Sequence, residues 1–265
     1  MKRIYVLSTC VMISIFFLSS CAEVQPYQQY RQSYQKLLKE DSFIVEKKET
    51  LITSQKSFGT SKNISNINNM EGTFRYVRNK EEDMLIANVA FNTMDGTPTI
   101  LNYYNRGGYL YSQNITNPAK NFRSQQKADN VINTVLEGII DIPKDVIAKQ
   151  SVRSTSEGNW ITFELDSEKY YAARFPETYA EYGYGGLSYY REQPVYTVLL
   201  DAQDRIKQVE GSFCTVNSDN SGFTWDQNYT NTFTQYEDVK LDFPDLHESE
   251  FPLLKEPDES WGQTP

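Results

Sequence analysis

The sequence predicts an α+β fold in which a few helices accompany an antiparallel β-sheet. Apolar and polar residues alternate in several short stretches, which is typical of strands with one buried face, and the clearest case is Leu85, Ala87, Val89 and Phe91. Residues 24–40 and 126–140 instead repeat their apolar side chains at helical spacing. Turn residues closely follow the strand-like stretches, so we expect neighbouring strands to run antiparallel.

The first residues predict a secretion signal that ends in a lipid-modified cysteine. Lys2 and Arg3 precede the apolar residues 4–18, which as a helix span roughly 22 Å and fall short of the ~30 Å core of a bilayer. The motif Leu-Ser-Ser-Cys that ends at Cys21 resembles the lipobox of bacterial lipoproteins. This resemblance implies cleavage before Cys21, a diacylglyceryl thioether on its sulfur, and anchoring on the outer face of the cytoplasmic membrane. An ordinary secretion signal or an uncleaved anchor is the alternative.

The mature chain is acidic and has a single cysteine that is not modified. Loss of the leader removes Lys2 and Arg3 but no acid, so the formal charge goes from −9 to −11. Such a surface repels nucleic acid, which we exclude as a partner. Cys10 leaves with the leader and Cys21 carries lipid, so Cys214 is expected to be a small buried residue without a disulfide.

Residues 24–40 predict the first helix. Pro26 suits its start, and its apolar face consists of Tyr27, Tyr30, Tyr34, Leu37 and Leu38. Four or five extended residues between Cys21 and this helix span at most roughly 18 Å. We therefore expect the domain to lie close to the membrane.

Two antiparallel meanders are predicted on either side of a second helix. Residues 42–114 contain the first meander, with turns at Asp95-Gly96 and at 106–108. Within it, residues 60–70 are rich in Asn and Ser without an apolar period, which predicts a mobile loop. Residues 126–140 predict the most regular helix, and Pro143 ends it and opens a short helix through residue 148.

The second meander follows this helical region. Ile161, Phe163 and Leu165 alternate, residues 195–200 are apolar throughout, and residues 223–239 predict the last strand. The chain then becomes acidic and proline-bearing, so we expect residues 242–265 to form a disordered tail. The predicted division is a signal peptide over 1–20, a single domain over 21–241, and this tail.

The order of these elements resembles the lipoprotein carrier (LolA-like) proteins and the related lipoproteins of mycobacteria and Gram-positive bacteria. The similar segments are Tyr103-Tyr104 followed by Gly108-Tyr109-Leu110-Tyr111, the Ile-Pro-Lys-Asp-Val-Ile run from 142, and residues 159–166. The resemblance covers most of residues 27–239. It implies a half-barrel, a curved sheet that wraps one or two helices and can enclose an acyl chain. It implies no catalytic residue.

Motifs for catalysis or for cofactors are absent from the sequence. The single histidine, His247, lies in the predicted tail beside acids, where a positioned imidazole is not expected. Residues 217–222 imitate the start of a calcium loop, but the twelfth position is Asn228, where a bidentate Glu is required. No GxSxG, Walker A or GxGxxG motif occurs. We therefore predict neither a metal nor a cofactor.

Residues 170–190 contain seven tyrosines around three glycines. A tyrosine ring is apolar with a polar tip, which suits lipid headgroups, glycans and protein interfaces. The rings predicted to contact a ligand or partner are Tyr179, Tyr182, Tyr184, Tyr189 and Tyr190. The alternative is that these rings only pack over the edge of the sheet.

These observations favour a noncatalytic, membrane-anchored extracytoplasmic lipoprotein that binds a hydrophobic or amphiphilic ligand or an envelope component. Two alternatives stay open. The first is a cell-surface interaction or sensing protein whose sheet is filled by its own side chains. The second is an enzyme that hydrolyses cell-wall glycans through a carboxylate pair, which has no sequence signature.

Replacing Cys21 by Ser should release the protein from the membrane fraction, because two acyl chains are needed for stable anchoring. Intact mass spectrometry of the wild type should show a lipid-sized increment on the N-terminal cysteine. A wild type that is processed at another residue and carries no lipid would contradict this assignment.

Overall fold

The computed structural model describes residues 25–56, 63–79, 82–92, 96–125, 129–218 and 222–254. Cys21 and the rest of the predicted leader lie outside the described residues, so the lipidation site stays a prediction. The same holds for residues 255–265 of the predicted tail. Among the described residues, no helix is both long and apolar enough to span a bilayer.

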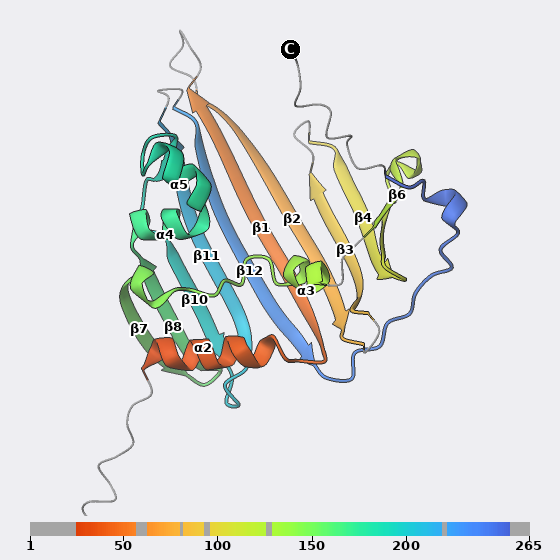
Figure 1. Ribbon diagram of the computed structural model, residues 1–265, viewed down its shortest axis with the longest axis horizontal. Helices are drawn as coiled ribbons and strands as arrows, with labels where there is room; N and C mark the ends of the chain where they lie inside the picture. Colours follow the sequence, from red (N-terminus) through yellow and green to blue (C-terminus); the bar gives the residue numbers. More distant parts are fainter. Residues whose placement is uncertain are drawn as a thin grey trace, which may run out of the picture.

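The described strands form one antiparallel sheet, which confirms the predicted α+β class (Figure 1). Its first half is a meander of β1 (Ser42–Lys56), β2 (Asn63–Val77), β3 (Met84–Asn92), β4 (Pro98–Arg106), β5 (Tyr109–Asn114) and β6 (Phe122–Gln125). Its second half is β7 (Ile147–Thr155), β8 (Gly158–Leu165), β10 (Val195–Leu200), β11 (Ile206–Asn217) and β12 (Thr224–Tyr236). The short β9 (Ser188–Tyr190) pairs with the end of β11. The two halves meet where β12 pairs with β1.

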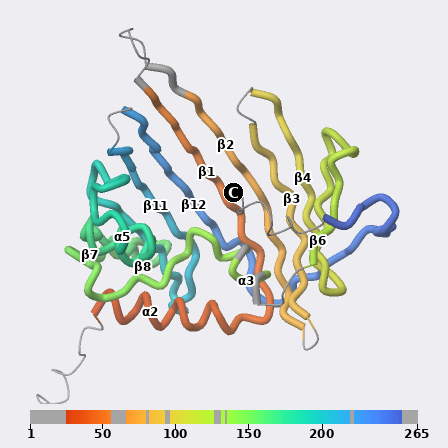
Figure 2. The backbone as a smooth tube through the Cα atoms, turned by 45° about the horizontal axis from the view of Figure 1, so that its top comes forward, coloured from red at the N-terminus to blue at the C-terminus, as the bar shows by residue number. Residues whose placement is uncertain are grey.

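The α-helices of the described residues lie in front of the sheet in Figure 1, and we call the face that they cover the inner face. They are α2 (Pro26–Leu37), α3 (Asp129–Val135), α4 (Ser167–Arg174) and α5 (Pro176–Tyr182). Single 3-10 turns are η1 (Pro118–Lys120), η2 (Lys144–Val146) and η3 (Glu248–Glu250). Figure 2 shows α2 running across one end of the sheet, below α5.

The core lies between the helices and the inner face. Alternate residues of each central strand face inward, as Val45 on β1 does between Phe74 on β2 and Phe233 on β12. Tyr30 of α2 is fully buried, its hydroxyl donates to the carbonyl of Ile140, and it lies 3.2 Å from the Tyr196 hydroxyl. These contacts join α2, the segment after α3 and β10 into one core.

The second helix is shorter than its apolar spacing predicts. α3 ends at Val135, and Gly138 adopts φ +88°, a left-handed conformation that stops a helix at little cost. Val131, Val135 and Ile139 are nevertheless all buried, as expected from their spacing. The helix predicted after Pro143 is only the turn η2, because β7 begins at Ile147.

The prediction of a loop over residues 60–70 is wrong for residues 63–70, which belong to β2. These residues pair with residues 49–56 of β1 in an unbroken register. The Thr50 hydroxyl also donates to the Asn69 side chain at 3.0 Å. Both faces of this hairpin are largely polar, so its strands lack the alternation by which strands are recognised in a sequence.

The prediction of a disordered tail is wrong for residues 242–254, which pack against the outer face. Phe251 is 1% exposed and contacts Tyr104 and Tyr111. Arg123 on β6 forms an ion pair with Glu248 at 2.7 Å and a short parallel bridge with Leu253. The segment passes the ends of β1 to β3 and reaches β6 (Figure 1, Figure 2). Its acidic composition predicted disorder although it contains apolar side chains that become buried.

Replacing Val135 by Asp should unfold or aggregate the protein. Val135 is completely buried on α3, and an unpaired carboxylate there costs on the order of several kcal/mol. Thermal unfolding checks this, with Val152→Asp on the exposed edge strand β7 as the control. An unchanged melting temperature for the Val135 variant would contradict the placement of α3.

Candidate functional site

A pocket of about 450 Å³ lies between the inner face, the segment after α3, and α4. Its sheet side comes from β1, β2 and β12, and it is lined by Lys47, Lys48, Glu49, Met70, Gln227, Tyr229 and Asn231. Its helical side is lined by Glu137, Gly138, Ile140, Asp141, Pro143, Tyr170, Ala173 and Arg174. Ligand sites in proteins commonly enclose about 300–1,000 Å³. We call this space the inner pocket.

The floor of the inner pocket is polar. Lys47 and Asn231 are direct partners in the β1–β12 register, and they are only 5% and 2% exposed. The Lys47 ammonium donates to the carbonyl of Glu137 at 3.1 Å and lies 4.8 Å from the centre of the Phe74 ring. Burial lowers the pKa of Lys47 to about 8, an effect that Glu137 and Glu49 partly oppose.

Asn231 brings an unusual donor to this floor. Its Nδ2 is buried and has no hydrogen-bond partner in the part of the chain that the structure describes. Gly138 lies directly above it, since a Cβ at this glycine would be 3.0 Å from Nδ2 and 3.1 Å from the Tyr229 ring. Any other residue at 138 would therefore close the space over the amide.

One wall of the inner pocket is aromatic. The Tyr229 ring folds over Gly211, where a Cβ would overlap it, and stacks on Phe213 with ring centres 5.9 Å apart. Tyr170 continues the stack at 5.7 Å from Phe213. Burial raises the pKa of both tyrosines, so their hydroxyls stay neutral. This wall offers ring surface to an apolar ligand.

The mouth of the pocket carries charge of both signs. α4 begins at Asp166, whose carboxylate caps the helix by accepting from the backbone of Lys169 at 3.0 Å. The helix then places exposed Arg174 with its guanidinium 5.5 Å from the Phe213 ring centre. Half-buried Glu49 accepts a hydrogen bond from Gln227 at 3.0 Å. The pocket can thus hold a molecule with a polar and an apolar part.

None of the five tyrosines predicted as contacts lines the inner pocket. Tyr184 and Tyr190 pack inward: the Tyr184 hydroxyl accepts from the Tyr190 backbone at 3.1 Å, and the Tyr190 ring stacks behind Tyr170. On α5, Tyr179 donates to Glu168 at 2.8 Å. Tyr182 and Tyr189 are 51% and 37% exposed. The tyrosine-rich segment does supply Tyr170 and Arg174 to the pocket.

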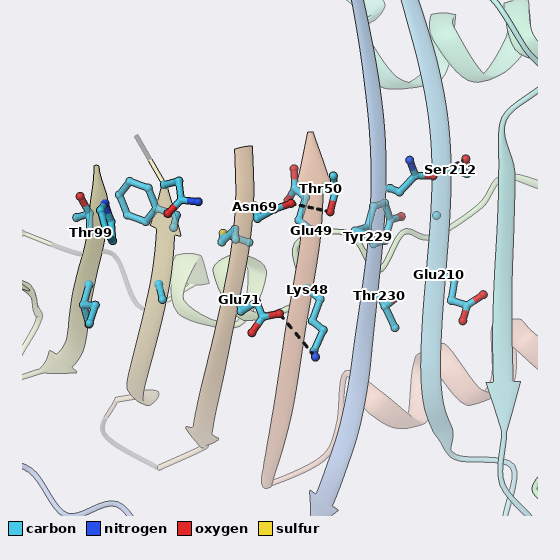
Figure 3. A pocket seen from close by; sticks show the side chains of 18 of the residues that line it. Lys48, Glu49, Thr50, Asn69, Glu71, Thr99, Glu210, Ser212, Tyr229 and Thr230 are labelled. Atoms are coloured by element: carbon cyan, nitrogen blue, oxygen red, sulfur yellow. Dashed lines mark hydrogen bonds and ion pairs between the residues drawn. The ribbon is translucent and has the colours of Figure 1, made fainter. Parts of the chain in front are cut away.

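A larger trough of about 810 Å³ crosses the outer face from β4 to β10 (Figure 3). Several of its outward side chains form hydrogen bonds or ion pairs with side chains on the neighbouring strand. Lys48 lies 3.7 Å from Glu71, Thr50 donates to Asn69 at 3.0 Å, and Ser212 donates to Asn228 at 2.8 Å. This arrangement is typical of a solvated sheet face, so the smaller inner pocket is the better candidate.

The remaining reactive residues do not converge on a site. His247 is exposed and lies 3.5 Å from Asp245. Cys214 is buried, as predicted, and burial together with Asp226 raises its pKa to about 12. Across the described ranges, no group of three His, Cys, Asp or Glu side chains is placed to hold a metal ion. Part of the calcium-like segment, residues 219–221, lies outside them.

No family model and no curated protein matches this chain. Among solved structures, the ywiB protein from Bacillus subtilis is 9% identical, and the match covers 74% of this chain and 95% of that one with a TM-score of 0.20. DynF from the dynemicin biosynthesis pathway of Micromonospora chersina is 8% identical, and the match covers 74% and 80% with a TM-score of 0.23. TM-scores this low carry no argument about fold or function.

Replacing Lys47 by Met should reveal the burial of its charge. In the folded protein Lys47 loses its proton near pH 8, whereas in the unfolded chain it does so near 10.5. The wild type should therefore gain stability relative to Lys47→Met as the pH rises through this window, by up to about 3 kcal/mol. Urea unfolding at about pH 7 and about pH 10 measures the difference. Lys48→Met, on the outer face, is the control and should show no such change; an equal response of both variants would contradict the burial.

Proposed function

We propose that this protein is a noncatalytic, lipid-anchored envelope protein that holds one small amphiphile in the inner pocket. The observation that carries the proposal is the pocket's division into a polar floor and an aromatic wall. Lys47 and Asn231 form the floor, and Tyr229 and Tyr170 form the wall. A ligand with a polar head and an apolar body matches both surfaces at once.

The proposal extends to the fold and to the location. An open sheet with helices on one face, reached after only a few residues from Cys21, is compatible with a half-barrel of the lipoprotein-carrier type. In that arrangement α2 lies next to the anchored end of the chain, and α4 and α5 lie toward the other end of the sheet (Figure 1). The pocket would then be held close to the membrane surface.

A second candidate function is binding of an envelope protein at the tyrosine-rich segment. Four apolar side chains on α5 and its flanking residues are exposed, namely Phe175, Tyr182, Leu187 and Tyr189. Neighbouring exposed apolar residues mark interaction surfaces more often than scattered ones do. This function needs no small molecule, so it corresponds to the interaction or sensing alternative.

Filling the mouth of the pocket tests the first proposal. Ala173 lines the pocket on α4, and Ala180 on α5 does not. Wild type purified from membranes should carry a bound small molecule in native mass spectrometry. Ala173→Trp should lose at least nine tenths of it by steric exclusion, whereas the matched variant Ala180→Trp should keep it.

Two results would contradict the proposal. One is a wild type that carries no small molecule and takes up none from an envelope lipid extract. The other is equal occupancy in the two tryptophan variants, with both of them folded by circular dichroism.

A further inference from the structure

The buried amide of Asn231 is the least satisfied donor of the inner pocket. Buried side-chain donors nearly always have a partner, so an unpaired one calls for an explanation. Asn231 is 2% exposed, its Nδ2 has no partner among the described residues, and the residue lines the pocket. A hydrogen-bond acceptor that enters the pocket would satisfy Nδ2.

Lys47 adds a positive charge beside this amide. The two residues are directly opposite in the β1–β12 register, and they lie on the inner face because the next pair on that face, Val45 and Phe233, is buried in the core. Directly opposed side chains start about 5 Å apart at their Cβ atoms. One small acceptor group can therefore contact both, while the Lys47 ammonium keeps its bond to the Glu137 carbonyl.

The surrounding charges indicate a single negative charge. Arg174 is a further cation, at the mouth, and Lys48, which also lines the pocket, is paired with Glu71 at 3.7 Å. Glu49 is already held by Gln227, and Glu137 and Asp141 are exposed at the rim. These acids disfavour a doubly charged phosphate, whereas a carboxylate brings one charge and two acceptor oxygens.

The residue that packs over the Asn231 amide is Gly138, which has no side chain to cover it. It adopts φ +88°, and a Cβ there would come within 3.0 Å of Asn231 Nδ2. A side chain at this position would therefore crowd the amide that the carboxylate is proposed to reach.

We propose that the ligand of the inner pocket is an amphiphilic carboxylic acid whose carboxylate binds between Lys47 and Asn231. This inference rests on the proposed function and names the chemical class of its ligand. The apolar body of the acid lies along the Tyr229 and Tyr170 rings, with Arg174 near the mouth.

Three probes with the same tail and different heads test the class: decanoate, decylamine and decanol. Calorimetric titration of delipidated wild type near neutral pH should show decanoate binding at least about ten-fold more tightly than the other two. Asn231→Asp and Lys47→Met should each weaken decanoate by about ten- to a hundred-fold. Lys207→Met, at an exposed position on β11 that does not line the pocket, should bind it like the wild type.

A second readout needs no variant and so does not depend on the folding of Asn231→Asp. At about pH 9, decanoate should drive proton uptake, because a bound anion favours the charged form of Lys47. Titrations in buffers of different ionisation enthalpy measure the number of protons taken up. Uptake approaching one proton supports the proposal, and no uptake overturns it.

The outcomes separate this inference from the function on which it rests. If all three probes bind equally and Ala173→Trp abolishes their binding, the pocket is an amphiphile site, but the inference that its ligand is a carboxylic acid is overturned. Tighter binding of decylamine, strengthened by Asn231→Asp, would also overturn it. If none of the probes binds and the native protein carries no ligand, the proposed function itself fails.

Discussion

The pairing of β12 with β1 is the interaction on which the rest of the structure depends. The two meanders are far apart in the chain, and this ladder joins their inner faces into one surface. Closing so long a loop is entropically costly, and it is offset by burying apolar surface from both halves. The same ladder places Lys47 of the first meander opposite Asn231 of the second. Neither half alone contains the floor of the inner pocket.

Along this seam the inner face changes from apolar to polar within one residue pair. Val45 and Phe233 belong to the core, and the next inward pair is Lys47 and Asn231. Buried polar groups of this kind lower stability unless their hydrogen bonds are made. Carboxylate binding would satisfy both groups, so the feature that weakens the empty protein is the one that would give the occupied protein its selectivity.

Much of the fold could be predicted because it follows from burial on one face. Leu85, Ala87 and Val89 occupy alternate positions on β3, and Tyr30 belongs to the apolar face expected from the helical spacing of α2. All four side chains are buried. The prediction of secondary structure failed where strand pairing or packing does not produce an alternating or helical pattern of apolar residues. The Asn-rich part of β2 is held by its ladder with β1, and Phe251 is buried by contacts with β4 and β5 that its acidic neighbours do not indicate.

The candidate site was only partly predictable. An inward lysine continuing the alternation of Phe43 and Val45 was a signal for Lys47, since charged residues are rarely placed on a core face. Asn231 had no comparable signal, because β12 is rich in Thr, Asn and Gln on both faces. The tyrosine-rich segment pointed to the correct neighbourhood through Tyr170. The five tyrosines named from it pack beside the pocket or face outward.

A crystal structure of the protein purified with its native lipids tests the central claim most directly. We predict one continuous, elongated feature of electron density in the inner pocket. Its polar end should lie within hydrogen-bond distance of Asn231 Nδ2 and Lys47 Nζ, and its body should lie against Tyr229. Separate water peaks over the Asn231 amide, with no connected density along the aromatic wall, would contradict the account.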